Sequence, residues 1–154
     1  MSQAPELRRA RPNDADFAWR LYAEAVEPHV GPYIASRFQR EWREDEERSR
    51  FDTWWTPENT SIISIADQQI GWFHVEETED EIILANYCIA SDYRRRGIGS
   101  KVLRLLLDSW SAARKPVTHS VLKTCPHHEF FKRHGFHVIG EDELAILMKR
   151  PVPA

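Results

Sequence analysis

The stretch Arg94-Arg95-Arg96-Gly97-Ile98-Gly99-Ser100 decides the fold that we expect of this chain. It follows an apolar run over residues 82–90 and opens a helical pattern over residues 101–113. Glycines let the main chain approach an anion closely, and the free amides and the dipole at the start of a helix attract negative charge. A basic, glycine-containing turn between a strand and a helix therefore predicts a site for a phosphorylated ligand.

The length and composition of the chain favour one ordinary domain. Its 154 residues, 42% of them hydrophobic, suffice for a single core, so we expect one domain over residues 1–154. A net charge of −3 gives no general basic surface for nucleic acid. The two cysteines lack the spacing of a disulfide scaffold, and neither a signal-peptide pattern nor an apolar run of about 18 residues occurs. We therefore predict a cytoplasmic protein with no membrane partner.

Hydrophobic periodicity predicts a mixed α+β domain. Strands are expected over residues 7–10, 61–66, 70–75, 81–90, 117–124, 136–140 and 144–149. The strand over residues 81–90 is the longest and most apolar, and should lie in the middle of the sheet. Helices are expected from Asn13, as N-cap, to just before Pro28, then through Ile34, Phe38 and Trp42 into the charge run over residues 41–48, over residues 98–113 and over residues 126–134.

The turn departs from two familiar phosphate-binding motifs. Gly97-Ile98-Gly99 lacks the third glycine of the Rossmann fingerprint, and no Gly-Lys-Ser/Thr follows as in a Walker A loop. A solvent-exposed basic loop that only caps a helix is the remaining structural alternative. The context favours the phosphate site over this alternative, because the turn follows the longest apolar strand and is followed about 35 residues later by the segment Phe130 to Phe136.

Together these segments resemble the GNAT superfamily of acyl-CoA-dependent N-acyltransferases. The family's core motif, Gln/Arg-x-x-Gly-x-Gly/Ala, matches residues 94–99, and its ending of an aromatic residue, three residues and Gly-Phe matches Phe131, Gly135 and Phe136. The resemblance covers the chain from Leu7 to about Lys149. It implies a three-layer fold with a mixed, mostly antiparallel sheet of about seven strands, about four helices, and central strands that splay apart.

The resemblance implies acetyl-CoA as co-substrate and no metal. The loop would bind the CoA pyrophosphate, and the main chain of residues 88–90 would pair with the pantetheine arm like an added strand. The implied cofactor-binding residues are Cys88, Ile89, Ala90, Arg94, Arg95, Arg96, Gly97, Ile98, Gly99, Ser100, Cys125 and Phe131. Cys125 would be either inert or able to form a mixed disulfide with the cofactor thiol.

Two positions depart from the family pattern. The tyrosine that commonly protonates the CoA thiolate is replaced by Phe131, which cannot donate a proton, and the usual glutamate base is replaced by Ile83. The CoA thiolate is an adequate leaving group even without a proton donor, because a thiol has a low pKa. An N-acetyltransferase is therefore expected, with a catalytically silent acyl-CoA-binding module as the alternative.

His74 is the first candidate for the missing general base, followed by Glu76 and Tyr87. If Glu76 and Glu81 are partners across their turn, antiparallel pairing sets His74 opposite Ile83 on the same face. A shift of one residue would turn His74 to the other face. The alternative is a half-buried strand histidine without a catalytic role.

The resemblance implies that the amine acceptor lies against the first two helices and the loop over residues 28–36. A cationic amine, either a small molecule or a peptide, would suit the aromatic and acidic side chains there, unless the aromatics form the core and the acids are only solvated. These side chains are Tyr33, Trp42, Trp54 and Trp55 with Glu41, Glu44 and Asp45.

Three histidines near the last helix are expected at the surface rather than at a metal: His127, His128 and His134. The edge strands near the C-terminus could also pair with a second copy of the chain, so a homodimer is possible.

Overall fold

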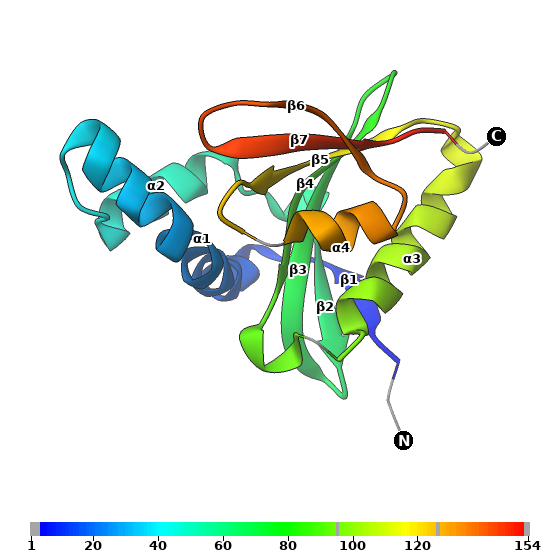
Figure 1. Cartoon of the computed structure of the whole chain (residues 1–154). Coiled ribbons are helices and arrows are strands. Elements are labelled where there is room, and N and C mark those ends of the chain that lie inside the picture. The colour runs from blue at the N-terminus through cyan, green and yellow to red at the C-terminus, as the bar shows by residue number, and fades with distance from the viewer. Residues whose placement is uncertain (1–3, 95, 126, 153–154) are drawn as a thin grey trace.

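One mixed sheet runs through the middle of the molecule (Figure 1). The computed structural model describes residues 4–94, 96–125 and 127–152. Within these ranges the strands are β1 Glu6–Arg9, β2 Thr60–Ile65, β3 Gln68–Glu77, β4 Ile82–Ile89, β5 Val117–Leu122, β6 His137–Glu141 and β7 Ala145–Arg150. Their order is β1-β2-β3-β4-β5-β7-β6, and only β4 and β5 pair in parallel. The predicted mostly antiparallel, seven-stranded sheet is confirmed.

Helices cover both faces of the sheet and complete three layers. They are α1 Ala15–Phe38, α2 Glu44–Trp54, α3 Ile98–Trp110 and α4 His127–Arg133. On one face, Trp19 of α1 and Phe51 of α2 belong to the buried cluster around Trp72 of β3. On the other face, Leu103 of α3 and Phe131 of α4 belong to a second cluster. Each helix therefore buries its apolar side against the sheet, as the predicted periodicity requires.

The first helix is longer than predicted. Our expectation that it stops before Pro28, and that a second helix starts near Ile34, is wrong: α1 continues through Pro28 and Pro32 to Phe38. Both prolines are exposed, so water can satisfy the carbonyls that lose their intrahelical hydrogen bond.

The ends of the helices also differ from the prediction. Asp14 rather than Asn13 is the N-cap of α1. Asp14 is almost buried and accepts hydrogen bonds from the Arg11 amide and the Arg8 guanidinium, which holds its pKa down at about 2. Trp42 lies in the loop before α2, so α2 consists mainly of the charge run and the aromatic residues after it.

The two central strands separate soon after they begin. β4 and β5 pair only at Ile82 with Val117 and at Ile83 with Thr118. Beyond these pairs, Nδ1 of His119 donates a hydrogen bond of 2.7 Å to the Leu84 carbonyl, and no further main-chain pairing is present along the described strands. The predicted splay of the central strands is confirmed, and it leaves one edge of β4 without a partner strand.

Candidate active site

The glycine loop presents the first turn of α3 as an anion site. Gly97 has φ +78°, in the left-handed region that suits glycine, and an added Cβ there would meet nothing within 4 Å. The first intrahelical hydrogen bond runs from the Lys101 amide to the Gly97 carbonyl. The amides of residues 98–100 therefore precede the hydrogen-bonded part of the helix, and no acidic side chain lies in this turn.

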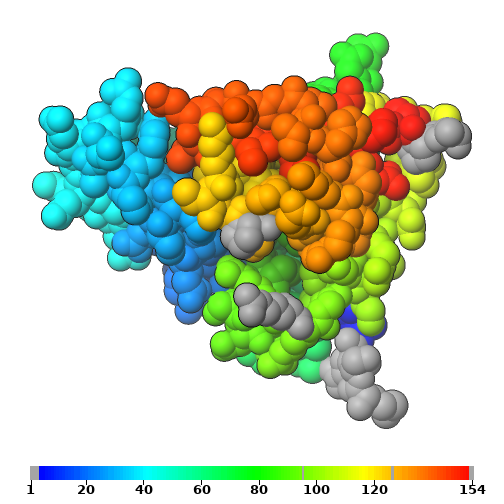
Figure 2. Space-filling view, viewed as in Figure 1, coloured from blue at the N-terminus to red at the C-terminus, as the bar shows by residue number. Residues whose placement is uncertain are grey.

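A hollow lies beside this loop. Figure 2 shows it between α4 and the segment that leads from β4 into α3, with the strands at its floor. The hollow lies where β4 and β5 separate, so an extended ligand in it would meet both the free edge of β4 and the first turn of α3.

The arginines of the loop have different environments. Arg94 turns back onto β4, where its Nε donates a hydrogen bond of 2.9 Å to the Ile89 carbonyl. The Arg96 guanidinium lies over the Tyr93 ring, 5.2 Å from its centroid. Arg95 lies outside the described residues. Only Arg96 of the two described arginines is thus turned away from the strand.

One edge of β4 is free at residues 88–90. Cys88 and Ile89 pair with β3, and the Ala90 amide donates to the Ile70 carbonyl, so their other edge faces the gap toward β5. Burial raises the pKa of the Cys88 thiol to about 12, and the thiol therefore stays neutral. Cys125 is a half-buried free thiol just beyond the end of β5.

Phe131 is buried beside Tyr87 of β4 and His119 of β5. Its side chain is 3% exposed and makes an edge contact with Tyr87, with ring centroids 6.4 Å apart. The imidazole of His119 lies 4.3 Å from the Phe131 ring centroid. The departure from tyrosine therefore leaves an apolar ring, with no hydroxyl, beside a buried histidine.

Tyr87 ties β4 to the glycine loop. Its hydroxyl donates a hydrogen bond of 2.6 Å to the Gly99 carbonyl in the first turn of α3. Burial raises the pKa of Tyr87 far above its usual value. Tyr87 is therefore placed to position α3 and poorly suited to accept a proton near neutral pH.

The predicted pairing of His74 with Ile83 is wrong. His74 pairs with Asn86, and Glu76 lies opposite Ile83. The hairpin turn closes between Thr78 and Glu81, and the register shifts at His74 because Ala85 is an extra residue in β4. The error amounts to two residues before this bulge, so Glu76 now occupies the place opposite Ile83 that we expected of His74.

His74 is buried behind Glu76. Its side chain is almost inaccessible, its Nδ1 lies 3.5 Å from the Thr60 hydroxyl, and the Trp54 ring packs against it. Its Nε2 lies 3.5 Å from Oε1 of Glu76, whose side chain is 55% exposed. Glu76 is therefore the member of this pair that solvent and an acceptor can reach.

His119 is the residue that our sequence interpretation missed. It lies between the core residues Val117 and Val121 on the inward face of β5, and burial lowers its pKa to about 4. A polar residue in an apolar alternation was the available signal. It carried no motif, and only the pairing of β4 with β5 brings it to the point where the strands separate.

Part of the predicted acceptor surface forms one groove. Its volume is about 530 Å³, and its lining includes Glu27, Pro28, Gly31, Pro32, Glu41 and Trp42. Trp54 and Trp55 instead pack around Phe51 in the core, and Tyr33 donates a hydrogen bond to Glu143. Glu41 and Trp42 thus meet the predicted 28–36 segment, whereas Trp54 and Trp55 contribute no wall to this groove.

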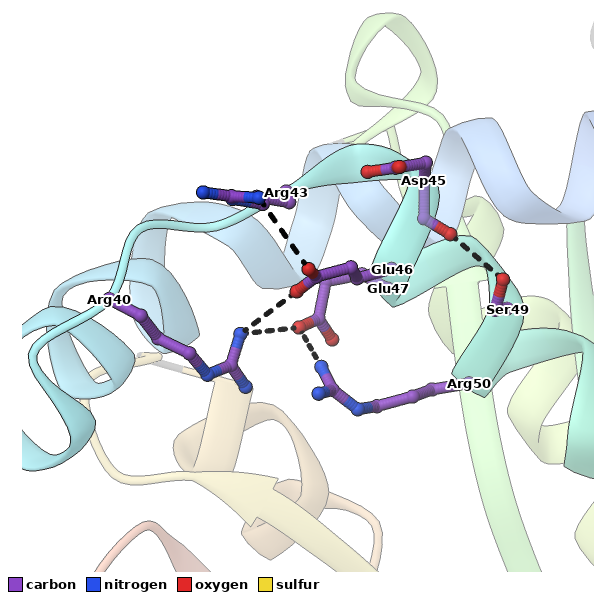
Figure 3. Close-up of polar contacts among 7 residues, drawn as sticks. All are labelled: Arg40, Arg43, Asp45, Glu46, Glu47, Ser49 and Arg50. Atoms are coloured by element: carbon purple, nitrogen blue, oxygen red, sulfur yellow. Dashed lines mark hydrogen bonds and ion pairs between the residues drawn. The ribbon is translucent and has the colours of Figure 1, made fainter.

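The acidic run of α2 is largely neutralised by arginines (Figure 3). Glu47 pairs with Arg40 and Arg50, and Glu46 pairs with Arg40 and Arg43. These contacts hold the loop before α2 against the helix. Glu46 and Glu47 are therefore paired within this surface, whereas Glu44 and Asp45 are exposed.

Two further findings concern the described residues as a whole. No three histidine, cysteine, aspartate or glutamate side chains in the described part of the chain are grouped so that they could hold a metal ion. None of its helices is both long enough and apolar enough to cross a membrane.

One family model matches more than half of the chain. Residues 56–138 match the model of the acetyltransferase (GNAT) domain. A comparison with proteins of curated function gave no match.

Solved structures resemble the chain over almost its full length. The PaiA N-acetyltransferase of Thermoplasma acidophilum, solved in complex with coenzyme A, has a TM-score of 0.70 at 14% identity, covering 96% of this chain and 99% of its own. The ribosomal-protein-S18-alanine N-acetyltransferase of Escherichia coli has a TM-score of 0.71 at 16% identity, covering 97% and 95%. An acetyltransferase of Thermus thermophilus has a TM-score of 0.69 at 19% identity, covering 98% and 99%. At these identities the likeness concerns the fold.

Proposed function

This chain belongs to the GNAT acetyltransferase family, and on that premise we propose that it is an N-acetyltransferase that uses acetyl-CoA. The acetyl group passes directly to an amine while both substrates are bound. The observation that carries the proposal is the gap between β4 and β5, which ends at the open first turn of α3. The two free thiols fit the reducing cytoplasm, where we place the enzyme.

The residues around the gap fit acetyl-CoA. The amides of residues 96–100, with Arg96, would hold the pyrophosphate, and residues 88–90 would pair with the pantetheine amides. Pairing at Ile89 requires Arg94 to release the Ile89 carbonyl, which frees a guanidinium beside the same ligand. Cys125 and Phe131 would flank the thioester end. The PaiA enzyme, of the same fold and solved with coenzyme A, supports this assignment.

The acceptor that we propose is a cationic amine, carried by a small molecule or by a peptide. Glu76 faces solvent opposite Ile83, at the closed end of the gap, and its carboxylate would attract a protonated amine. His74 would position this carboxylate from behind. The groove bordered by Glu27, Glu41 and Trp42 would take a more distant part of the acceptor.

An acceptor screen tests the proposal. Released CoA thiol is measured with a panel of primary amines and N-terminal peptides, and acetylation is verified by mass spectrometry. We expect turnover with at least one cationic amine and none without protein. A homodimer through the edge strand β6 is a separate prediction, which sedimentation of the same sample tests.

A catalytically silent acyl-CoA-binding module is the second candidate. It is favoured by Ile83 and by the buried, apolar Phe131, which replace the usual base and acid. Tight binding of acetyl-CoA without thiol release on any amine would establish this candidate and exclude the enzyme.

A further inference from the structure

The main-chain groups of Ile89 lie on the free edge of β4. Ile89 is opposite Gly71 of β3, and the neighbouring Ala90 amide donates a hydrogen bond to the Ile70 carbonyl. In an antiparallel ladder, only alternate residues direct their amide and carbonyl to the partner strand. Because Ala90 bonds to β3, the amide and carbonyl of Ile89 point the other way, into the gap between β4 and β5. A strand-like ligand in this gap would therefore pair with Ile89.

The side chain of Arg94 already occupies the Ile89 carbonyl. Its Nε donates a hydrogen bond of 2.9 Å to this oxygen, and no carboxylate among the described residues forms an ion pair with Arg94. Its charge acts on both β4 and α4. It opposes the rise in pKa that burial imposes on the Cys88 thiol, and partial burial and this charge lower the pKa of His127 at the start of α4. The guanidinium therefore lies, without a counterion, beside the path of an extended ligand.

A ligand that pairs with β4 competes with Arg94. A ligand amide that donates to the Ile89 carbonyl takes the place of Nε of Arg94. Hydrogen bonds from a charged donor are stronger than those from a neutral amide, so a ligand that offers only amides loses by this exchange. A ligand that also carries phosphate gives the released guanidinium a stronger partner than a carbonyl, because both groups are then charged.

We propose that Arg94 determines donor specificity by favouring thioesters of CoA over thioesters of pantetheine alone. In the free protein Arg94 holds the Ile89 carbonyl. In the complex a pantetheine amide takes this carbonyl, and the guanidinium moves to the pyrophosphate. Arg96, which lies over the Tyr93 ring, would contact the pyrophosphate without such an exchange. This inference rests on the proposed function and adds that one side chain couples pairing at the strand edge to binding of the phosphates.

Calorimetric titrations with CoA and with pantetheine test this exchange. Arg94→Met removes the hydrogen bond and the charge, so pantetheine should bind about 3- to 10-fold more tightly and CoA about 3- to 10-fold more weakly. Arg94→Gln keeps an N–H donor at the same number of bonds from the main chain but has no charge. Its affinity for pantetheine should stay within about twofold of wild type, while its affinity for CoA falls.

Arg96→Met is the matched control for the loss of charge. It removes one arginine of the same loop but not the contact with Ile89, so CoA should bind more weakly and pantetheine as in the wild type. Folded Arg94→Met that binds pantetheine no more tightly than wild type overturns the inference. A gain of pantetheine affinity in Arg96→Met equal to that in Arg94→Met also overturns it.

A crystal structure of the wild type with CoA gives a readout that needs no variant. We expect a pantetheine amide on the Ile89 carbonyl and the Arg94 guanidinium on the pyrophosphate. Arg94 that still holds the Ile89 carbonyl in the complex overturns the inference even if the variants fail to fold. Wild-type protein that binds neither CoA nor pantetheine, by contrast, refutes the proposed function itself.

Discussion

The donor side and the acceptor side of this molecule are specified in different ways. The proposed donor side consists of two short stretches, residues 88–90 and 96–100, whose main chain lies at the strand edge and at the helix start. The proposed acceptor side and the buried His119 come from separate elements: Glu76 from β3, His119 from β5, and the groove from α1 and the segment after it. A site made of main-chain groups can be recognised from a short sequence motif. A site made of side chains from several elements depends on strand register and packing, which a short motif does not reveal.

The largest expected effect concerns His119, whose properties depend entirely on tertiary packing. Its pKa is lowered to about 4 in the folded chain, so the unfolded chain takes up the proton first as the pH falls. The contribution of the neutral His119 to the free energy of unfolding is therefore fully present above about pH 6.5. It is lost as the pH falls toward about 4, which lowers the free energy of unfolding by about 3 kcal/mol.

Urea unfolding of wild type and His119→Gln between neutral pH and about pH 4 measures this loss. The variant should lack this part of the pH dependence, and His137→Gln, at an exposed histidine of β6, should keep it. Identical pH dependence of stability in wild type and His119→Gln would show that tertiary packing does not lower the pKa of His119. Asp14 does not interfere, because its pKa of about 2 places its loss at lower pH.

A change at Gly97 tests the donor side. Valine cannot adopt φ +78° without strain of about 1–2 kcal/mol, so Gly97→Val should reorient the amides of α3 and weaken CoA binding about 5- to 30-fold. Gly140→Val is the matched control, because an added Cβ there also meets open space and its φ is not positive. Calorimetric titration with CoA decides: equal affinity in both variants would contradict our placement of the pyrophosphate.

Tyr87→Phe probes the link between the donor strand and the donor helix. The variant removes only the hydroxyl that donates to the Gly99 carbonyl, so we expect the free energy of unfolding to fall by about 1 kcal/mol. CoA affinity should fall in step, because the first turn of α3 loses its tie to β4. Unchanged stability together with a large loss of kcat would instead support the catalytic role that the sequence analysis considered for Tyr87.

The smallest expected effect belongs to Glu76 on the acceptor side. An exposed carboxylate contributes about 0.2–1 kcal/mol to an ion pair, so Glu76→Gln should raise KM for a cationic amine up to about fivefold, with kcat nearly unchanged. The effect should fade at high ionic strength. A loss of kcat that salt does not alter would show that Glu76 acts on protons rather than on charge.

The same contrast explains which parts of the structure the sequence predicted. The places of the strands along the chain follow from periodicity, and the turn at Gly97 follows from a motif of consecutive residues. The splay of β4 and β5 follows from the resemblance that this motif carries. The exposed prolines of α1 misled us because their cost can be offset by solvent. Local signals thus sufficed for most of the fold.

The relations of His74 and His119 to their neighbours were harder to predict because these neighbours are not close to them in the sequence. The extra residue Ala85 in β4 changes the strand partner of His74. The spacing of residues in the sequence does not predict such a β-bulge. His119 acquires its environment from the Leu84 carbonyl and from Phe131, which are far away in the sequence. Such residues become visible only when the pairing of the strands is known.

Hydrogen–deuterium exchange with and without acetyl-CoA tests the central claim, that the cofactor lies along β4 and against the start of α3. We predict slower exchange on binding at the amides of residue 89 and of residues 96–100, and unchanged exchange in β1 and β2, whereas the Ala90 amide is already bonded to the Ile70 carbonyl. Saturating acetyl-CoA that leaves these amides unprotected, while protecting amides elsewhere in the chain, would contradict the account.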